Sequence, residues 1–334
     1  MQVDAVAEFS ADPLEVEAAA LAAEADGYAG ITVPETQHDA LLALSLAARA
    51  TERITLQTGI AVAFSRNPMT LAMQANDVQL VSGGRLELGL GSQVKAHIER
   101  RFGMPWSRPA ARMEEFVSAV RAIWKCWETG ERLRFEGEFY THTLMTEFFD
   151  PGPNPHGNPP ILLAAVGERM TEVAGRVSDG LLAHALTTES YLREVTFPAL
   201  TRARGGSLDG FVVTLPVFSV LGADPEARAK AEAGVRRQIA FYGSTPAYRP
   251  VLDHHGWGEL AEKLNRLSRQ QAWDEMATAI DDDVLTAFAL AGTPAELATR
   301  IEERYGDLAD RVSLYTPYDV DPELLTATAK HLRG

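Results

Sequence analysis

The sequence predicts a single domain, residues 1–334, folded as a closed (β/α)8 barrel, the TIM-barrel class of α/β fold. Two observations carry this prediction: eight short apolar segments alternate with helix-like segments, and no long polar linker separates two halves of the chain. Alternating strands and helices are typical of a parallel sheet, and barrels of this kind routinely reach this length as one domain. The alternation is interrupted between the fourth and fifth strands, which predicts an insertion over about residues 93–159.

The eight expected strands are short apolar runs, several of them bounded by glycine, proline or aspartate. They cover residues 3–7, 31–33, 54–60, 85–91, 161–165, 181–183, 211–221 and 311–315. Pro216 predicts a break or bulge in the seventh strand, because proline has no N–H for a strand ladder.

Several expected helices begin with the same signal, a capping side chain followed by proline in the first helical position. The pairs are Asp12-Pro13, Asn67-Pro68, Asp224-Pro225, Thr293-Pro294 and Asp321-Pro322. In the first helix, a core-facing stripe is predicted from the spacing of Leu14, Ala18, Leu21 and Ala25. Residues 242–290 do not follow the alternation of strands and helices. They predict an irregular helical excursion from the barrel, interpreted as a lid or an oligomer surface.

Composition and charge exclude several classes of partner. Hydrophobic residues make up 46% of the chain and charged residues 23%, an ordinary globular mixture. The 31 basic and 46 acidic side chains give a net charge of −15, which disfavours nucleic acid and anionic membrane surfaces as partners. No segment reaches membrane-spanning length, and no basic stretch precedes an apolar run at the N-terminus. The single cysteine, Cys126, cannot form an internal disulfide, so a cytoplasmic protein is expected.

Residues 54–93 form the unit around which the site is expected. They are interpreted as a strand, an amphipathic helix and a second strand, in the order of a parallel β-α-β unit. The first strand ends at Gly59-Ile60, where glycine permits a backbone path that most residues resist. The second ends at Gly91-Ser92-Gln93, where small residues let backbone N–H groups approach an anion.

Chemistry in this fold is expected where the strands end. Glu8 follows the first strand and is interpreted equally well as an acid or base or as a carboxylate that caps a helix or pairs with an arginine. His38 could exchange a proton, but the adjacent Asp39 favours a residue that merely starts a helix. His184 follows three apolar strand residues and is expected to face the pocket, although many such histidines only bind a loop.

No metal site is predicted. His254-His255 is an adjacent pair without matching carboxylates, which favours a surface loop. Ser65, Ser92 and Cys126 lack the context of an activated nucleophile.

Several stretches, taken in order, resemble one known family. They are residues 23–27, 54–60, 66–68, 82–92, 112–114, 160–167, 174–180 and 292–296. In these the chain resembles the luciferase-like flavin/deazaflavin oxidoreductases, and more narrowly their coenzyme F420-dependent branch. Two departures, Thr36 in place of a histidine and Val94 in place of a glutamate, set it apart from the family's sugar-phosphate dehydrogenases.

The resemblance implies a cofactor site at the strand ends. It implies a non-proline cis peptide at Gly59-Ile60 beneath the deazaflavin ring, with Glu35 and Thr36 beside that ring. It also implies that two loops hold the phosphate and side chain of the cofactor. Their residues are Gly91, Ser92 and Gln93 in one loop and Ala165, Val166, Gly167, Glu168 and Arg169 in the other.

The resulting functional hypothesis is hydride transfer between F420 and a small organic substrate, with His184, Glu8 and His38 as the candidate catalytic residues. An FMN-dependent monooxygenase served by a partner reductase remains an alternative. A barrel that binds cofactor without turnover remains another. A homodimer or larger homo-oligomer is expected through the second and third helices, because residues 41–48 are apolar on nearly all sides.

Overall fold

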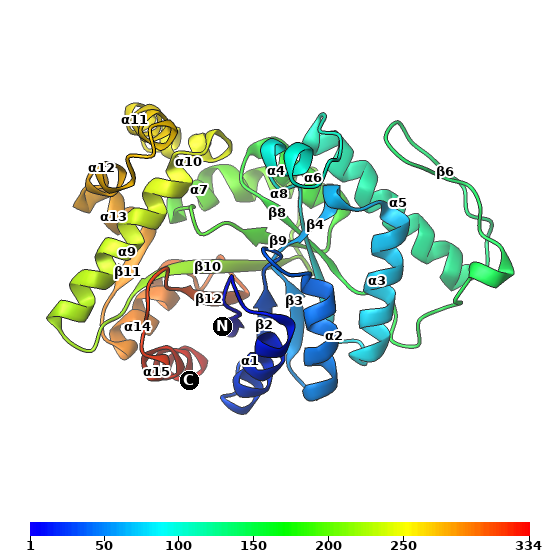
Figure 1. Cartoon of the computed structure of the whole chain (residues 1–334), viewed down its shortest axis with the longest axis horizontal. Helices are drawn as coiled ribbons and strands as arrows, with labels where there is room; N and C mark the ends of the chain where they lie inside the picture. Colours follow the sequence, from blue (N-terminus) through cyan, green and yellow to red (C-terminus); the bar gives the residue numbers. More distant parts are fainter.

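The computed structural model describes all residues 1–334 and confirms the closed parallel barrel (Figure 1). Strand β1 pairs with both β2 and β12, and β10 pairs with both β9 and β12, which closes the barrel. The barrel strands are β1 (Gln2–Val6), β2 (Gly30–Val33), β3 (Thr55–Thr58), β5 (Leu86–Gly91), β8 (Ile161–Ala165), β9 (Gly180–Ala183), β10 (Val212–Val220) and β12 (Arg311–Tyr315).

Helices surround the strands, and five of them begin at the capping residues that the sequence predicted. The outer helices are α1 (Pro13–Ala25), α2 (Ala40–Ala50), α3 (Pro68–Val81), α5 (Pro109–Thr129), α6 (Glu168–Val177), α8 (Phe197–Ala203), α9 (Pro225–Gly243), α14 (Pro294–Tyr305) and α15 (Pro322–Arg333). The five that begin at the predicted capping residues are α1, α3, α9, α14 and α15. Asp12 and Thr293 each form a capping box with the glutamate three residues on. No helix is both long and apolar enough to cross a bilayer.

The chain between β5 and β8 forms the expected insertion. It contains α4 (Lys95–Arg100), α5, an antiparallel pair of β6 (Phe135–Glu136) and β7 (Thr141–His142), and the short helix η2 (Glu147–Phe149). Figure 1 shows the β6–β7 arm reaching away from the barrel at the right.

The excursion between α9 and α14 builds a second apolar cluster beside the barrel. It comprises η4 (Pro246–Tyr248), α10 (Arg249–His254), α11 (Gly258–Arg269), α12 (Trp273–Thr278), α13 (Asp282–Phe288) and the short strand β11 (Ala289–Ala291), which pairs with β10. With parts of α9, β10 and the segment after β9, these elements bury a cluster of 20 residues, against 60 in the main core. Between β9 and β10 the remaining segments are α7 (Glu189–Tyr191) and η3 (Leu192–Thr196).

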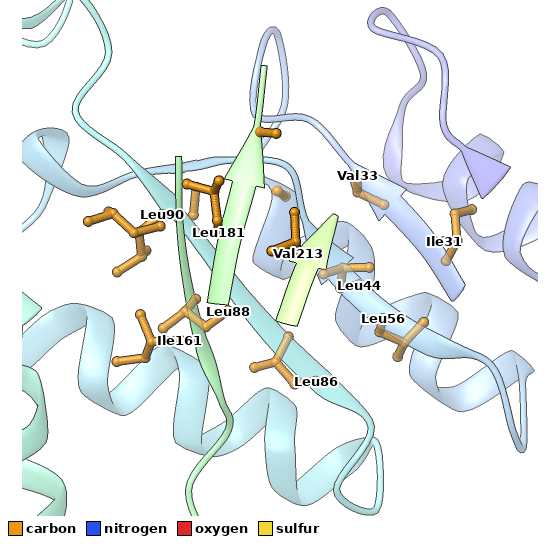
Figure 2. Packing of buried hydrophobic residues seen from close by; sticks show 14 of the residues in the cluster. Ile31, Val33, Leu44, Leu56, Leu86, Leu88, Leu90, Ile161, Leu181 and Val213 are labelled. Carbon is orange, nitrogen blue, oxygen red and sulfur yellow. The ribbon is translucent and has the colours of Figure 1, made fainter. Parts of the chain in front are cut away.

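The strands bury apolar side chains against the helices. Figure 2 shows Leu86, Leu88 and Leu90 of β5 in a row, and Leu44 of α2 beside Leu56. All five side chains are almost fully buried. Because side chains alternate along a strand, Glu87, Gly89 and Gly91 face the other way, into the barrel.

The interior of the barrel begins with a charged network at its N-terminal end. Arg311 donates to both carboxylate oxygens of Asp4, at 2.8 and 2.6 Å, and to Glu87 at 3.3 Å. Gln57 donates to the other oxygen of Glu87 at 2.8 Å. Gly30 leaves space for this network, because a Cβ there would lie 2.3 Å from the Arg311 guanidinium.

Two details predicted from the sequence are wrong. In α1 the buried stripe is Val16, Ala20 and Ala23, whereas Leu14 and Leu21 are 69% and 53% exposed. Strand β10 also runs unbroken through Pro216. On one side of β10, β9 pairs with Val212–Thr214 and β11 with residues 218–220. Pro216 lies between these segments, where β10 has a strand partner on one side only, so its missing N–H costs little there.

Candidate functional site

The floor of the candidate site is a bulge that follows β3. Gln57 of β3 pairs with Glu87 of β5, and Ala61 of β4 (Ala61–Val62) pairs with Leu90 of β5. The five residues 57–61 therefore lie opposite the four residues 87–90, so the chain between β3 and β4 contains one extra residue. The peptide bond Gly59-Ile60 in this bulge is cis. A Cβ on Gly59 would lie 2.2 Å from Thr32, and a Cβ on Gly91 would lie 2.9 Å from Ile60. Two predicted cofactor-binding residues, Ile60 and Gly91, are therefore in contact.

Glu35 holds this bulge in place. Its carboxylate accepts from the backbone N–H of Val62 and from Arg66, both at 2.8 Å, and its own N–H donates to the carbonyl of Ile60 at 3.3 Å. The side chains of Glu35 and Arg66 are each only 9% exposed. Arg66 also pairs with Asp39 at 2.6 Å. The Glu35 carboxylate is therefore engaged in stabilising the bulge.

The loops after β1 and β2 are tied together at the rim of the barrel. The Thr36 hydroxyl donates to the carbonyl of Phe9, and Arg101 donates to the carbonyl of Thr36. Glu8 is exposed beside Phe9, at the mouth. His38 is also exposed, next to Asp39, which caps α2 through the N–H of Leu42 at 2.9 Å. The structure thus places His38 at a helix start.

The two predicted phosphate loops leave neighbouring strands, because β5 pairs with β8. In the first loop Gln93 has a left-handed φ of 57°, an uncommon conformation for glutamine that often marks a functional loop. In the second, α6 begins after Gly167 with no side-chain cap, which leaves backbone N–H groups for an anion. A Cβ on Gly167 would meet no atom within 4 Å, so the space beside this loop is open. Glu168 is turned outward and pairs with Arg202 at 2.7 Å, and Arg169 is exposed.

His184 lies at the end of β9 inside an aromatic cluster. Its ring stacks on Tyr248 with centroids 4.3 Å apart and meets the edge of Tyr242 at 4.6 Å. Its Nδ1 accepts from the backbone N–H of Leu186 at 3.0 Å. Burial lowers the pKa of His184 from 6.5 to about 4, so the ring is neutral near pH 7. Because Nδ1 is an acceptor, the proton lies on Nε2, which can donate to a ligand.

Tyrosines extend the wall from His184 across the mouth. The hydroxyls of Tyr242 and Tyr315 lie 2.9 Å apart, and Tyr315 meets the ring of Phe9 edge-on at 6.2 Å. Burial raises the pKa of Tyr242 above its usual value and raises the pKa of Tyr248 to about 12. Both phenols are therefore neutral near pH 7. Tyr315 is the last residue of the strand predicted over residues 311–315, and the sequence did not indicate Tyr242 or Tyr248 as site residues. The only sequence feature that marked these two tyrosines was their position at the start of the irregular helical segment predicted over residues 242–290.

A small cavity joins the β8 and β9 ends. It measures about 10 Å³ and is lined by Ala165, Val166 and His184, among others. Tyr191 anchors this wall by donating to the carbonyl of Val166 at 3.1 Å. A larger groove of about 540 Å³ lies on the outside, between β11, α13 and α14, and includes none of the predicted site residues. No group of three or more histidine, cysteine or carboxylate side chains is placed to hold a metal ion.

Comparisons with known proteins identify the family of the chain and agree with its barrel fold. The model of a family described as luciferase-like monooxygenase matches residues 3–311. A protein of Mycobacterium tuberculosis, named only as uncharacterized, is 50% identical over 297 residues, covering 88% of this chain and 87% of that protein. The 5,10-methylenetetrahydromethanopterin reductase of Archaeoglobus fulgidus is 29% identical over 285 residues, which are 83% of this chain and 81% of the reductase. The solved structure of the coenzyme F420-dependent tetrahydromethanopterin reductase from Methanopyrus kandleri superposes with a TM-score of 0.79 at 21% identity, covering 99% and 96% of the two chains.

Proposed function

Because the chain belongs to the luciferase-like monooxygenase family, we propose that it is an F420-dependent oxidoreductase acting on a small organic substrate. The observation that carries the proposal is the pairing of two candidate anion-binding loops, which follow adjacent strands. Gly91–Gln93 and Gly167–Arg169 offer backbone N–H groups at one rim, directly beside the floor made by Ile60. That arrangement suits a cofactor with a flat ring and an anionic tail. The reductase names among the similar proteins add support for F420.

In this proposal one set of residues binds the cofactor and another set donates a hydrogen bond or a proton to the substrate. When bound, F420 would supply the hydride-transfer chemistry. Ile60 and Gly91 would support the ring, and backbone N–H groups of the Gly91–Gln93 loop and of the start of α6 would hold the phosphate. His184 would donate its Nε2 proton as a hydrogen bond to an oxygen of the substrate, while Leu186 fixes the ring orientation. This tautomer suits a substrate whose reacting oxygen accepts a hydrogen bond. Glu8 is the second candidate, as an exposed carboxylate at the same mouth.

A matched pair of variants at Gly167 tests the cofactor site. Gly167→Ala adds a Cβ into open space at a φ of −76°, so F420 affinity should remain within about twofold of wild type. Gly167→Trp should fill the same space and weaken binding by about tenfold or more, which corresponds to ~1.4 kcal/mol. Fluorescence titration of F420 gives both constants. Equal affinity in the two variants would remove this loop from the site.

We also propose a homodimer through α2 and α3. These helices expose large apolar side chains on the outside of the barrel. They are Leu42, Met73, Leu80 and Val81, at 57%, 54%, 50% and 44% exposure. Light scattering should report a dimer for the wild type and a monomer for Leu42→Glu combined with Met73→Glu. Leu144→Glu, on the insertion arm, is the control and should remain dimeric. A wild-type monomer at micromolar concentration contradicts the proposal.

A further inference from the structure

A compact basic segment lies at the rim of the candidate site. Residues 95–101 carry Lys95, His97, Arg100 and Arg101, all exposed, and only one carboxylate, Glu99. Lys95 approaches Glu99 at 3.8 Å, whereas no carboxylate forms an ion pair with Arg100 or Arg101. In a chain of net charge −15, this segment is a local reversal of sign. It therefore favours an anionic ligand.

Its position relates it directly to the proposed phosphate loop. Helix α4 begins two residues after Gln93, and the buried side chain of Ile98 anchors it to the core. Arg101 lies over the ring of Phe102 at 4.9 Å and donates to Thr36 in the loop after β2. The helix lies at the upper end of the barrel in Figure 1. An anionic chain leaving the phosphate loop would thus meet these cations next.

We infer that residues 95–101 bind the anionic oligoglutamate tail of the deazaflavin cofactor. This inference rests on the proposed function. The tail continues beyond the phosphate as a chain of carboxylates, whereas FMN ends at its phosphate. Arginine suits this role because its planar fork can donate two parallel hydrogen bonds to one carboxylate. Arg101 spends one of its five N–H groups on Thr36 and keeps the others for the tail.

The loops after β1 and β2, which adjoin the basic segment through the contact of Arg101 with Thr36, are unsuited to the same ligand. They carry Glu8, Glu35 and Asp39, whose charges repel a row of carboxylates. Arg66, the cation among them, is already paired with both Glu35 and Asp39. The charge distribution therefore directs the tail over α4, and gives the chain a means to prefer F420 over FMN.

The test compares dissociation constants for long-tailed F420 and for the same cofactor with its glutamates removed. Wild-type protein should bind the long-tailed form more tightly by about tenfold at low salt, and the difference should shrink as salt screens the charges. Lys95→Glu combined with Arg100→Glu should abolish that difference while leaving affinity for the tail-less form within about twofold. Arg132→Glu combined with Arg134→Glu makes the same charge change on the insertion arm and should behave as wild type.

The outcomes separate the two proposals. If wild type binds both forms equally, or if the α4 variant keeps the preference for the long tail, the tail site is wrong and the cofactor assignment stands. If neither form binds to wild type, the F420 assignment itself fails, and the tail site with it. Circular dichroism of each variant confirms that the fold is intact.

Discussion

The two ends of the barrel interior bury polar side chains in opposite ways. At the N-terminal end, Asp4, Glu87 and Arg311 satisfy one another with Gln57. At the C-terminal end, His184 uses Nδ1 on the backbone and makes no hydrogen bond through Nε2 within the protein. Two strands run between these ends with the same inward face, since Arg311 and Tyr315 lie four residues apart on β12, as do Glu87 and Gly91 on β5. At the N-terminal end the polar groups bond to one another, whereas at the C-terminal end the Nε2–H of His184 is left available to a ligand.

The largest expected effect is a loss of stability on disrupting the charged network at the N-terminal end of the barrel. Arg311→Met leaves Asp4 and Glu87 buried without their cation, and loss of one partner from a buried charge network costs about 3–5 kcal/mol. Urea unfolding should show that loss in the free energy of unfolding. Arg132→Met, at an exposed arginine, should change it by less than about 0.5 kcal/mol. A loss below about 1 kcal/mol for Arg311→Met would show that the network is not important for stability.

The two ends should also respond to pH with opposite sign. Burial raises the pKa values of Asp4 and Glu87 above 3.8 and 4.5, so the folded state holds these protons more tightly than the unfolded chain. Their contribution to stability is present at low pH and is lost as pH rises through the raised values. Burial lowers the pKa of His184 from 6.5 to about 4, so its contribution is lost as pH falls across that range. The His184 loss amounts to at most about 3 kcal/mol.

Unfolding curves between pH 4 and 8 separate these contributions. Relative to wild type, Glu87→Gln should gain stability as pH rises, and His184→Ala should gain stability as pH falls. If the stability of both variants follows wild type in parallel across this range, the pKa directions are wrong.

A smaller effect on stability, but a selective one on activity, is expected at the open end. His184→Ala removes the Nε2 donor and should lower turnover by roughly 10²-fold, a typical loss for one positioned donor. Affinity for F420 should change by less than about threefold, because the proposed role of the His184 imidazole is to contact the substrate and not the cofactor. His38→Ala is the control, since His38 is exposed at a helix start, and should keep wild-type turnover. Full turnover in His184→Ala would transfer the role to Glu8.

The sequence predicted most of the barrel because local signals determine it. Asp12, Thr293 and their glutamates define helix starts within a few residues, and those signals do not depend on the rest of the fold. It failed in α1, where Leu14 and Val16 belong to two stripes of equal helical spacing. Only packing against the neighbouring elements selects between such stripes.

The candidate site was less predictable because its contacts join distant segments. Strand ends indicated Ile60, Gly91 and His184, but no local pattern shows that Glu35 is occupied by Arg66 and the N–H of Val62. The aromatic wall likewise depends on Tyr242 and Tyr248, which the excursion brings back to the end of β9. Such contacts follow from tertiary structure, and the sequence holds no periodic signal for them.

The measurement that tests the central claim most directly is a pair of equilibrium titrations of purified wild-type protein, one with F420 and one with FMN. Loops at Gly91–Gln93 and Gly167–Arg169 bordered by the basic segment 95–101 should give F420 the lower dissociation constant, by at least about tenfold, or ~1.4 kcal/mol. An FMN dissociation constant equal to or below that of F420, or no binding of either, would contradict the assignment of this barrel as an F420-dependent oxidoreductase.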